Sequence, residues 1–391
     1  MRVGIDYTSA ATQREGIGRA TRELVNALLR LPDCPDLHLV YAHRGPVPAA
    51  DALGVHERVK LRRLPLSPRV MLAGWYKARL PLPVEALLGP LHVMHGPDFV
   101  LPPRVAAAGV VTVHDLAFAT RPEDAHPAQR RFLESAVPWS IDRARLVVAV
   151  SETTRRDLMT RYGVRPHRIR VVPNAVSSEF HERDGAEELA EVRRRLRLPE
   201  EFLLSVGTIH PRKNLGGLAR AAALSGRQLG RTLPVVHVGR EGWLCERVFA
   251  DIESAGSPGI RFVGQIGDAT LRALYRQAAA LVYPSFAEGF GLPILEAFAC
   301  GTPVVTSNGS GMLEAAGDAA ELVDPHDPES IAAGIVRVAR DVDRRAELVE
   351  RGRRRLEDFS WSRSARLMLD VYAEARRGEP SPQVSGVAAK R

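Results

Sequence analysis

Short apolar runs alternate along the chain with longer stretches in which apolar residues recur every three or four positions. The short runs are typical of buried strands, and the wider spacing is typical of helices with one buried face. Strands that alternate with helices in this way predict a parallel sheet with helices on both faces. In the first half of the chain, the strand-like runs lie at residues 2–6, 37–42, 91–95, 110–114 and 146–150, and a further run ends at Val172.

The alternation starts again after residue 200, with strand-like runs at 202–206, 235–238, 260–263, 280–283 and 320–323. A chain of 391 residues is also too long for one ordinary hydrophobic core, so two domains are expected. The predicted fold class is α/β, with two Rossmann-like, doubly wound parallel sheets. We place the first domain at 1–180, the second at 201–358, and an interdomain connection at the charged residues 181–200.

The C-terminal part of the chain is predicted to be helical. Residues 328–356 have the pattern of two helices, and apolar residues recur at helical spacing from Phe359 to about residue 376. Residues 377–391 are rich in Pro, Ser, Gly and Lys, and we expect them to be disordered.

One stretch, from Tyr283 to Thr306, combines a strand, a glycine-rich loop and a helix. Pro293 suits the first turn of a helix, and Gly301 suits its end. The start of such a helix carries unsatisfied N–H groups and a partial positive charge, which favour an anion. The stretch therefore predicts an anion-binding turn at the end of a buried strand.

Two carboxylates frame this turn. Glu288 lies in the loop, and Glu296 is predicted to lie on the first turn of the helix. A carboxylate only accepts hydrogen bonds, so it suits sugar or ribose hydroxyls rather than phosphate. The alternative is a capping glutamate and a solvated one. We interpret the pair as ligands for hydroxyls on either side of a bound diphosphate.

The segment E-G-F-G-L-P-I-L-E-A-F-A-C-G-T-P-V-V resembles the signature of retaining, nucleotide-sugar-dependent glycosyltransferases of family four (glycosyl transferase group 1), which have the GT-B fold. The resemblance extends, more thinly, over residues 1–376. It implies that Glu288 contacts the donor sugar and that Glu296 binds the ribose. It also implies an acceptor-binding first domain completed by the final helix, 359–376, and a diphosphate bound by the backbone of Gly289, Phe290, Gly291 and Leu292.

His114 lies at the end of the strand-like run 110–114, where ligands of parallel sheets gather. A histidine after a strand is often structural. The resemblance places a histidine here beside the donor sugar, so His114 is a candidate catalytic residue. Asp115 either caps a turn or orients His114.

Gly16 and Gly18 lie on a loop between the first strand and a helix expected to begin near Gly18. A G-x-G pair is weak evidence, because many α/β proteins have one at a plain turn. The resemblance implies a loop across the cleft from the donor diphosphate, so both glycines are candidate donor-binding residues.

Arg212 and Lys213 follow the strand at 202–206 and are predicted to lie near a helix N-terminus, with Asn214 as its N-cap. Two cations there could neutralise a diphosphate leaving group, although they could also be solvated surface charges. The resembled family uses a basic pair in this region, and in some members its arginine lies soon after the V-G step, where this chain has Thr208. We count Thr208 as a donor-binding residue. Lys213 is therefore the firmer of the two catalytic candidates.

Two further strand ends are predicted to line the nucleotide pocket. Gly239 follows the strand at 235–238, and backbone groups near Ile266 are expected to face the base by family analogy. No side chain there identifies the base. GDP-mannose is our first expectation for the donor, from the resemblance of G-T-I-H-P-R-K-N, with UDP- and dTDP-sugars behind it.

We expect neither a metal nor a cofactor, because protein cations and N–H groups can stabilise the leaving diphosphate. The sequence has one Asp-x-Asp triplet, Asp341-Val342-Asp343, which lies in a helical, arginine-rich pattern and is interpreted as a solvated face. The alternatives to a transferase are a nucleotide-sugar epimerase of the same fold and a non-catalytic nucleotide-sugar binder. A glycosidase also uses two carboxylates but does not need the cations.

The formal net charge is +8, yet no nucleic-acid recognition module is present, so nucleic acid is not an expected partner. The expected partners are a nucleotide sugar and a glycan or lipid-linked acceptor. A basic segment that contains aromatic residues could also dock on an anionic membrane, or could simply be a solvated face. Its basic residues are Arg58, Lys60, Arg62, Arg63, Arg69, Lys77 and Arg79.

No apolar run approaches the length of a transmembrane helix, and the strand pattern at 2–6 leaves no room for a secretory signal. Cys34, Cys245 and Cys300 lie far apart in sequence, without the spacing of a zinc site or a disulfide framework. We therefore expect a cytoplasmic protein, with peripheral contact at the inner membrane face as an option.

Overall fold

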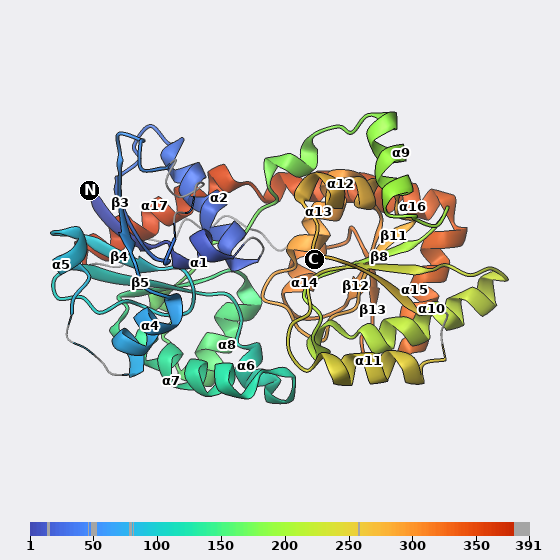
Figure 1. Ribbon diagram of the computed structural model, residues 1–391, viewed down its shortest axis with the longest axis horizontal. Coiled ribbons are helices and arrows are strands. Elements are labelled where there is room, and N and C mark those ends of the chain that lie inside the picture. The colour runs from blue at the N-terminus through green and yellow to red at the C-terminus, as the bar shows by residue number, and fades with distance from the viewer. Residues whose placement is uncertain are drawn as a thin grey trace.

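The computed structural model describes residues 1–13, 16–45, 47, 53–77, 80, 82–256 and 259–378. Two lobes lie side by side, each built on one parallel sheet with helices on both faces (Figure 1). This arrangement confirms the predicted fold class of two doubly wound α/β domains.

The sheet of the first lobe has the strand order β3-β2-β1-β4-β5-β6-β7 in the described residues, and all its neighbours pair in parallel. The sequence pattern did not predict β3, because its V-K-L-R-R-L carries three exposed cations. Such charges are common on edge strands, where they discourage pairing with other chains. The strands are β1 (Arg2–Asp6), β2 (Asp36–Ala42), β3 (Val59–Leu64), β4 (Val93–Gly96), β5 (Ala108–Val113), β6 (Leu146–Ala149) and β7 (Ile169–Val171).

The sheet of the second lobe has the order β10-β9-β8-β11-β12-β13, again with parallel pairing. Its strands are short, and all but the edge strand β10 are largely buried, as their apolar sequences predict. They are β8 (Leu203–Val206), β9 (Val235–Val238), β10 (Ile260–Gly264), β11 (Ala280–Tyr283), β12 (Val304–Ser307) and β13 (Glu321–Val323).

The helices cover both sheets (Figure 1). In the first lobe they are α1 (Thr8–Thr12), α2 (Ile17–Leu29), α4 (Pro68–Leu72), the π-helix η1 (Ala73–Lys77), α5 (Glu85–Leu88), α6 (Ala117–Thr120), η2 (Pro122–Asp124), α7 (Pro127–Arg143), α8 (Glu152–Tyr162) and η3 (Pro166–Arg168). From the second lobe to the end of the described chain they are η4 (Ser178–His181), α9 (Ala186–Arg195), η5 (Pro211–Lys213), α10 (Leu215–Leu229), α11 (Cys245–Ser254), α12 (Asp268–Gln277), α13 (Leu292–Cys300), α14 (Ser310–Ala316), α15 (Pro328–Arg340), α16 (Val342–Arg355), η6 (Leu356–Asp358) and α17 (Trp361–Arg377).

The last helix, α17, follows the second lobe in sequence but packs against the first (Figure 1). Met368 and Tyr372 are buried in the first-lobe core. The hydroxyl of Tyr372 lies 2.8 Å from His95 Nδ1, and the hydroxyl of Thr112 lies 2.8 Å from His95 Nε2. Burial lowers the pKa of His95 to about 3, so this histidine is neutral and joins α17 to the sheet.

The segment proposed as the interdomain connection, 181–200, contains helix α9 and is tied to the second lobe. Arg272 of α12 forms ion pairs with Glu182 at 2.6 Å and with Asp184 at 2.8 Å. Leu198 is buried in the second-lobe core. The exact domain boundaries stay a prediction, and residues 379–391 of the predicted tail lie outside the described residues.

The aromatic residues of the basic segment at 58–80 pack inside the protein, so they are not available to a membrane. Trp75 is buried against Ala42, and the ring of Tyr76 lies edge-on to Phe132 and Trp139. Lys60, Arg62, Arg63 and Arg69 are exposed, as are Val70 and Leu80. The side chain of Lys77, and Arg79, lie outside the described residues.

The Asp-x-Asp triplet lies at the start of α16: Val342 and Asp343 are the first two residues of the helix, and Asp341 precedes them. Asp341 lies between α15 and α16, and its carboxylate accepts a hydrogen bond from the backbone N–H of Arg344 at 2.8 Å. It is therefore the N-cap of α16, because the side-chain oxygen satisfies one of the free N–H groups there. All three residues of the triplet are exposed.

Candidate active site

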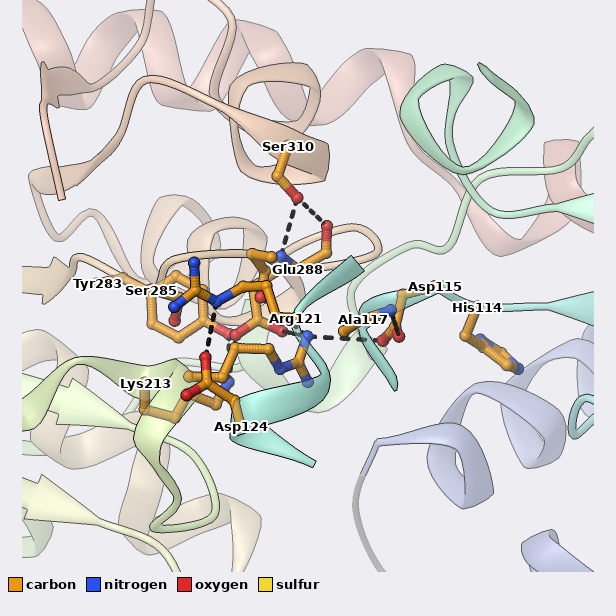
Figure 2. Close-up of polar contacts among 12 residues, drawn as sticks. His114, Asp115, Ala117, Arg121, Asp124, Lys213, Tyr283, Ser285, Glu288 and Ser310 are labelled. Atoms are coloured by element: carbon orange, nitrogen blue, oxygen red, sulfur yellow. Dashed lines mark hydrogen bonds and ion pairs between the residues drawn. The ribbon is translucent and has the colours of Figure 1, made fainter. Parts of the chain in front are cut away.

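Glu288 lies at the centre of a charged cluster between the ends of β8 and β11 (Figure 2). Lys213 Nζ donates to Glu288 Oε1 at 2.7 Å and to the hydroxyl of Tyr283 at 2.7 Å. Arg212 Nη1 lies 3.4 Å from Glu288 Oε2 and donates to the carbonyl of Ala287 at 2.8 Å. The two predicted cations therefore each contact one oxygen of the predicted carboxylate.

Burial and the neighbouring charges together set the pKa values of the groups in this cluster. Burial by itself raises the pKa of Glu288, but the positive charges of Arg212 and Lys213 outweigh it and lower that pKa to about 2. Burial also outweighs the attraction of Glu288 at Lys213 and lowers the pKa of its ammonium group. Arg212 is also buried, but the carboxylates of Glu288 and Asp115 raise its pKa.

Asp115, whose role the sequence left open, belongs to this cluster. Its Oδ1 accepts a hydrogen bond from the backbone N–H of Ala117 at 2.8 Å, at the start of α6. Its Oδ2 lies 3.5 Å from Arg212 Nη1, across the gap between the lobes (Figure 2). Asp115 therefore caps a turn in the first lobe and contacts a cation of the second.

His114 lies at the end of β5, but its ring points away from the charged cluster (Figure 2). Its Nε2 lies 2.8 Å from the carbonyl oxygen of Pro97. Because a carbonyl can only accept, Nε2 carries the proton and Nδ1 is the acceptor. Burial lowers the pKa of His114, so the ring is neutral. The ring borders a small cavity of about 30 Å³ inside the first lobe, between the sheet, α2 and α17.

The glycine-rich loop allows the two lobes to touch through their backbones. A Cβ on Gly289 would lie 1.9 Å from the carbonyl oxygen of His114, in the other lobe. A Cβ on Gly311 would lie 2.3 Å from the carbonyl oxygen of Gly289. Gly291 has φ +112°, which a side chain would strain. Glycine is therefore required at all three positions by the close approach or by the backbone angle.

Ser310 fixes the backbone of Glu288, and sequence reasoning missed it. Its hydroxyl accepts from the N–H of Glu288 at 2.8 Å and donates to the carbonyl of Glu288 (Figure 2). Ser310 itself has φ +61°, an uncommon angle for a residue with a side chain. Its place in S-N-G-S-G marked a turn but gave no sign of this contact.

Helix α13 begins at Leu292 and ends at Cys300, and the next residue, Gly301, caps it with φ +72°. Its start lies directly after the loop, as predicted, and Pro293 lies in its first turn. Phe290 is buried, with its ring edge-on to Phe359, so the part of this residue that could meet a ligand is its backbone. Leu292 is partly buried against the second-lobe core.

Glu296 is the fifth residue of α13, so it lies on the second turn and not on the first as predicted. It is buried and bound from two sides. The hydroxyl of Tyr275 donates to its Oε2 at 2.9 Å, and Arg19 Nη1 donates to its Oε1 at 2.9 Å. Arg19 comes from the first lobe and was not predicted as a site residue, although it follows the G-x-G pair directly.

The G-x-G pair begins helix α2. Gly16 has φ +58°, and a Cβ on Gly18 would lie 2.2 Å from the carbonyl oxygen of Gln13. The two glycines thus permit a tight turn that leads α2, and with it Arg19, to the gap between the lobes. Contact between the glycines and a donor diphosphate stays a prediction.

The other predicted donor-binding positions lie at strand ends of the second lobe. Gly239 follows β9, and a Cβ there would lie 1.9 Å from the carbonyl oxygen of Gly207, which follows β8. Thr208 is half-buried in the same loop, and Ile266 follows β10, packed against the core. Asn214 is the N-cap residue of α10, as predicted, but its side chain caps no N–H group there. It has φ +55°, and its amide donates to the carbonyls of Pro284 and Pro325 at 3.1 and 2.7 Å.

A further contact joins the lobes on the side of α6 and η2, and no sequence pattern predicted it. The indole N–H of Trp243 donates to the carbonyl of Asp124 at 2.7 Å, and its ring stacks on His210 at 4.5 Å. The guanidinium of Arg121 lies 4.5 Å from the centre of the Phe286 ring. The first lobe therefore contacts the second on both sides of the charged cluster.

The part of the chain that the structure describes contains no group of three or more His, Cys, Asp or Glu side chains placed to hold a metal ion. Among the same residues, no helix combines the length and the apolar character that crossing a bilayer requires.

Comparison with known proteins gives a consistent picture. Residues 188–355 match the family described as "Glycosyl transferases group 1", and residues 14–180 match "Glycosyltransferase Family 4". The chain is 36% identical over 283 residues to the O-antigen chain mannosyltransferase B of Escherichia coli, covering 72% of this chain and 74% of the relative. It is 40% identical over 277 residues to the D-inositol 3-phosphate glycosyltransferase of Salinispora tropica, covering 66% of this chain and 56% of that relative.

Among solved structures, the sucrose-phosphate synthase of Thermosynechococcus elongatus has the same fold. It superposes with a TM-score of 0.73 at 22% identity, covering 97% of this chain and all of the other. The expected fold is thereby confirmed, because two facing lobes with these sheets are the GT-B architecture. The chain therefore belongs to the family 4, group 1 glycosyltransferases.

Proposed function

We propose that this enzyme moves a hexose from a nucleotide sugar to a hydroxyl of a glycan, glycolipid or small-molecule acceptor, with retention of anomeric configuration. The observation that carries the proposal is the convergence of Arg212 and Lys213 on Glu288, beside the start of α13. In such a reaction the bond between the sugar and the diphosphate breaks, and negative charge develops on the leaving phosphate. Fixed cations and N–H groups favour that charge most strongly in the transition state.

In the proposed complex, the donor diphosphate lies against the first N–H groups of α13 and shares Arg212 and Lys213 with Glu288. A phosphate oxygen that departs from the sugar accepts the proton of the acceptor hydroxyl on the same face. The new glycosidic bond then forms as the old one breaks, and the nucleoside diphosphate leaves. Glu288, ionised because of the two cations, lies where it can offset the positive charge that develops on the sugar.

Two further parts of the proposal concern the donor. Glu296 accepts hydrogen bonds from the ribose hydroxyls, since an ionised carboxylate accepts hydrogen bonds and does not donate them. GDP-mannose is the proposed donor, supported by the motif at 207–214 and by the mannosyltransferase among the relatives. A metal ion is not part of the proposed mechanism, because Arg212 and Lys213 supply the positive charge.

For an acceptor carried by a lipid, we propose peripheral contact with an anionic membrane through the exposed cations of β3 and α4. Lys60, Arg62, Arg63 and Arg69 are exposed there, beside Val70. Each such cation adds about 1 kcal/mol of attraction to an anionic surface. Co-sedimentation with vesicles of anionic and of neutral lipid tests this, and equal binding to both contradicts it.

The proposed function is tested by a thermal-shift screen of nucleoside diphosphates and nucleotide sugars, followed by turnover with and without acceptors. We expect a guanosine diphosphate to raise the melting temperature most, and release of the diphosphate to require an acceptor. Release of nucleotide and an altered sugar without any acceptor indicates an epimerase instead. If the protein binds a nucleotide sugar but transfers its sugar to none of the acceptors, it is a non-catalytic binder.

A further inference from the structure

Arg19 reaches from the first lobe into the second and contacts two carboxylates there. Its Nη1 donates to Glu296 Oε1 at 2.9 Å, and its Nη2 forms an ion pair with Asp268. Arg19 lies in the first turn of α2, whereas Asp268 begins α12 and Glu296 lies in α13. One guanidinium therefore joins one helix of the first lobe to two helices of the second.

The contact is largely shielded from water. The side chain of Arg19 is 12% exposed and that of Glu296 is 7% exposed, whereas Asp268 is 32% exposed. A carboxylate that is removed from water is unfavourable unless a cation and hydrogen bonds compensate it. Arg19 supplies this compensation to Glu296 from the opposite lobe, and the phenol of Tyr275 supplies the second hydrogen bond from within the same lobe.

The shape of the guanidinium matters here. Arginine presents several N–H groups in one fixed plane, so it can bind two carboxylates at once, whereas a lysine ammonium is a single point charge. The ring of Phe180 lies 5.5 Å from the guanidinium carbon of Arg19 and adds a contact on its face. These contacts hold the planar guanidinium group of Arg19 in a defined orientation toward Glu296.

We propose that Arg19 is a positioning residue for the donor: it orients the Glu296 carboxylate for the ribose only when the lobes are closed. This inference rests on the proposed function, in which Glu296 binds the ribose. When the lobes separate, Arg19 leaves with the first lobe and Glu296 loses one of the groups that orient it. The binding of the donor nucleotide and the closure of the cleft thus favour each other, because both require the same carboxylate in the same place.

The test compares Arg19→Ala and Arg19→Lys with wild type in donor KM, kcat, and the Kd of a nucleoside diphosphate measured by calorimetry. We expect Arg19→Ala to raise the donor KM and the Kd about tenfold, with less change in kcat and none in the acceptor KM. Arg19→Lys should weaken donor binding less than Arg19→Ala, since lysine keeps the positive charge but not the planar set of N–H groups. Arg30→Ala, at the exposed far end of the same helix, is the matched control and should leave all four values unchanged.

A double-mutant cycle with Glu296→Gln separates positioning from a purely structural role. If Arg19 acts through Glu296, Arg19→Ala adds almost nothing to the donor KM once Glu296 has been changed. Additive effects overturn the inference, as does an unchanged KM in Arg19→Ala. If Arg19→Ala does not fold, the cycle is run with Arg19→Lys, to the same criterion. A wild-type protein that binds no nucleoside diphosphate and turns over no nucleotide sugar overturns the proposed function itself, and with it the donor role of Arg19.

Discussion

Glu314 of the second lobe accepts two hydrogen bonds from Thr153 of the first. The backbone N–H of Thr153 lies 2.5 Å from Glu314 Oε1, and its hydroxyl lies 2.6 Å from the same oxygen. The N–H of Glu152 donates to Glu314 Oε2 at 2.7 Å. A carboxylate thus satisfies free N–H groups at the start of α8 from across the gap between the lobes, and negative charge is favourable at that end of a helix.

Glu314→Ala is therefore expected to loosen the closed arrangement. Loss of a capping carboxylate typically costs about 1 kcal/mol, and here the cost falls on the contact between the lobes. We expect a lower melting temperature by calorimetry and a larger radius of gyration by X-ray scattering. Glu188→Ala is the control, because Glu188 accepts a hydrogen bond from the N–H of Gly185 within one lobe. An equal increase of the radius in both variants contradicts the role of Glu314 between the lobes.

Lys213→Ala is expected to lower turnover at least tenfold, because it removes a cation from the proposed site of the leaving diphosphate. The measurement is kcat with the preferred donor, with circular dichroism to show that the variant is folded. Arg227→Ala removes an exposed cation from α10, away from the proposed site, and should leave kcat unchanged. Wild-type kcat in a folded Lys213→Ala protein shows that the catalytic assignment of Lys213 is wrong.

Gly289→Ala should prevent the close approach of the two lobes. The added methyl group would lie 1.9 Å from the carbonyl oxygen of His114, so the loop or the lobes must move apart. We expect at least a tenfold lower kcat/KM together with a larger radius of gyration. Gly309→Ala adds the same group two residues before Gly311, with no atom within 4 Å of it, and should be neutral. The interpretation fails if both alanine variants keep wild-type activity.

The stability of the first lobe is expected to fall as the solution becomes acidic, partly because of His95. Burial lowers the pKa of His95 from 6.5 to about 3, so between these values the unfolded chain binds a proton that the folded protein does not. The contribution of His95 to the free energy of unfolding therefore rises with pH in this range. It is complete above about pH 6.5 and is lost as the pH falls toward 3.

Urea unfolding at pH 7, 6 and 5 checks this expectation. One proton of difference corresponds to about 1.4 kcal/mol per pH unit. His95→Gln, which cannot be protonated, should have a smaller fall in stability between pH 7 and 5, although it is less stable at pH 7. His167→Gln changes an exposed histidine and should keep the wild-type slope. A wild-type slope in His95→Gln indicates that other groups cause the acid sensitivity.

The candidate site could be predicted from the sequence where its signal is local. The strand β11, the loop with Gly289 and Gly291, and the start of α13 follow from residues within one short stretch. Each of these features depends only on nearby residues: the strand on an apolar run, the loop on glycines that allow a positive φ, and the helix start on a proline in the first turn. Local reasoning also placed Asn214 at the N-cap of α10, but it could not predict that its amide donates to carbonyls far away in sequence, from a left-handed backbone that asparagine tolerates.

The contacts between the lobes could not be predicted in this way. Arg19 and Glu296 are 277 residues apart, and Glu314 and Thr153 are 161 residues apart. A charged residue at the start of a helix is equally compatible with solvent, so nothing in the local sequence marks Arg19 as buried. The direction of the His114 ring likewise depends on Pro97 at the end of a neighbouring strand.

The sequence by itself determined two α/β domains, the glycine-rich turn at the start of α13, and the chemical character of Arg212, Lys213, Glu288 and Glu296. These follow from periodicity and from backbone preferences, which act over a few residues. Only the tertiary structure decided that Arg212 and Lys213 hold Glu288 between them, and that Arg19, Asp115 and Glu314 connect the two lobes. Ion pairs of this kind require charges from distant segments to come within about 4 Å in a site shielded from water, and only the packing of the two lobes brings them there.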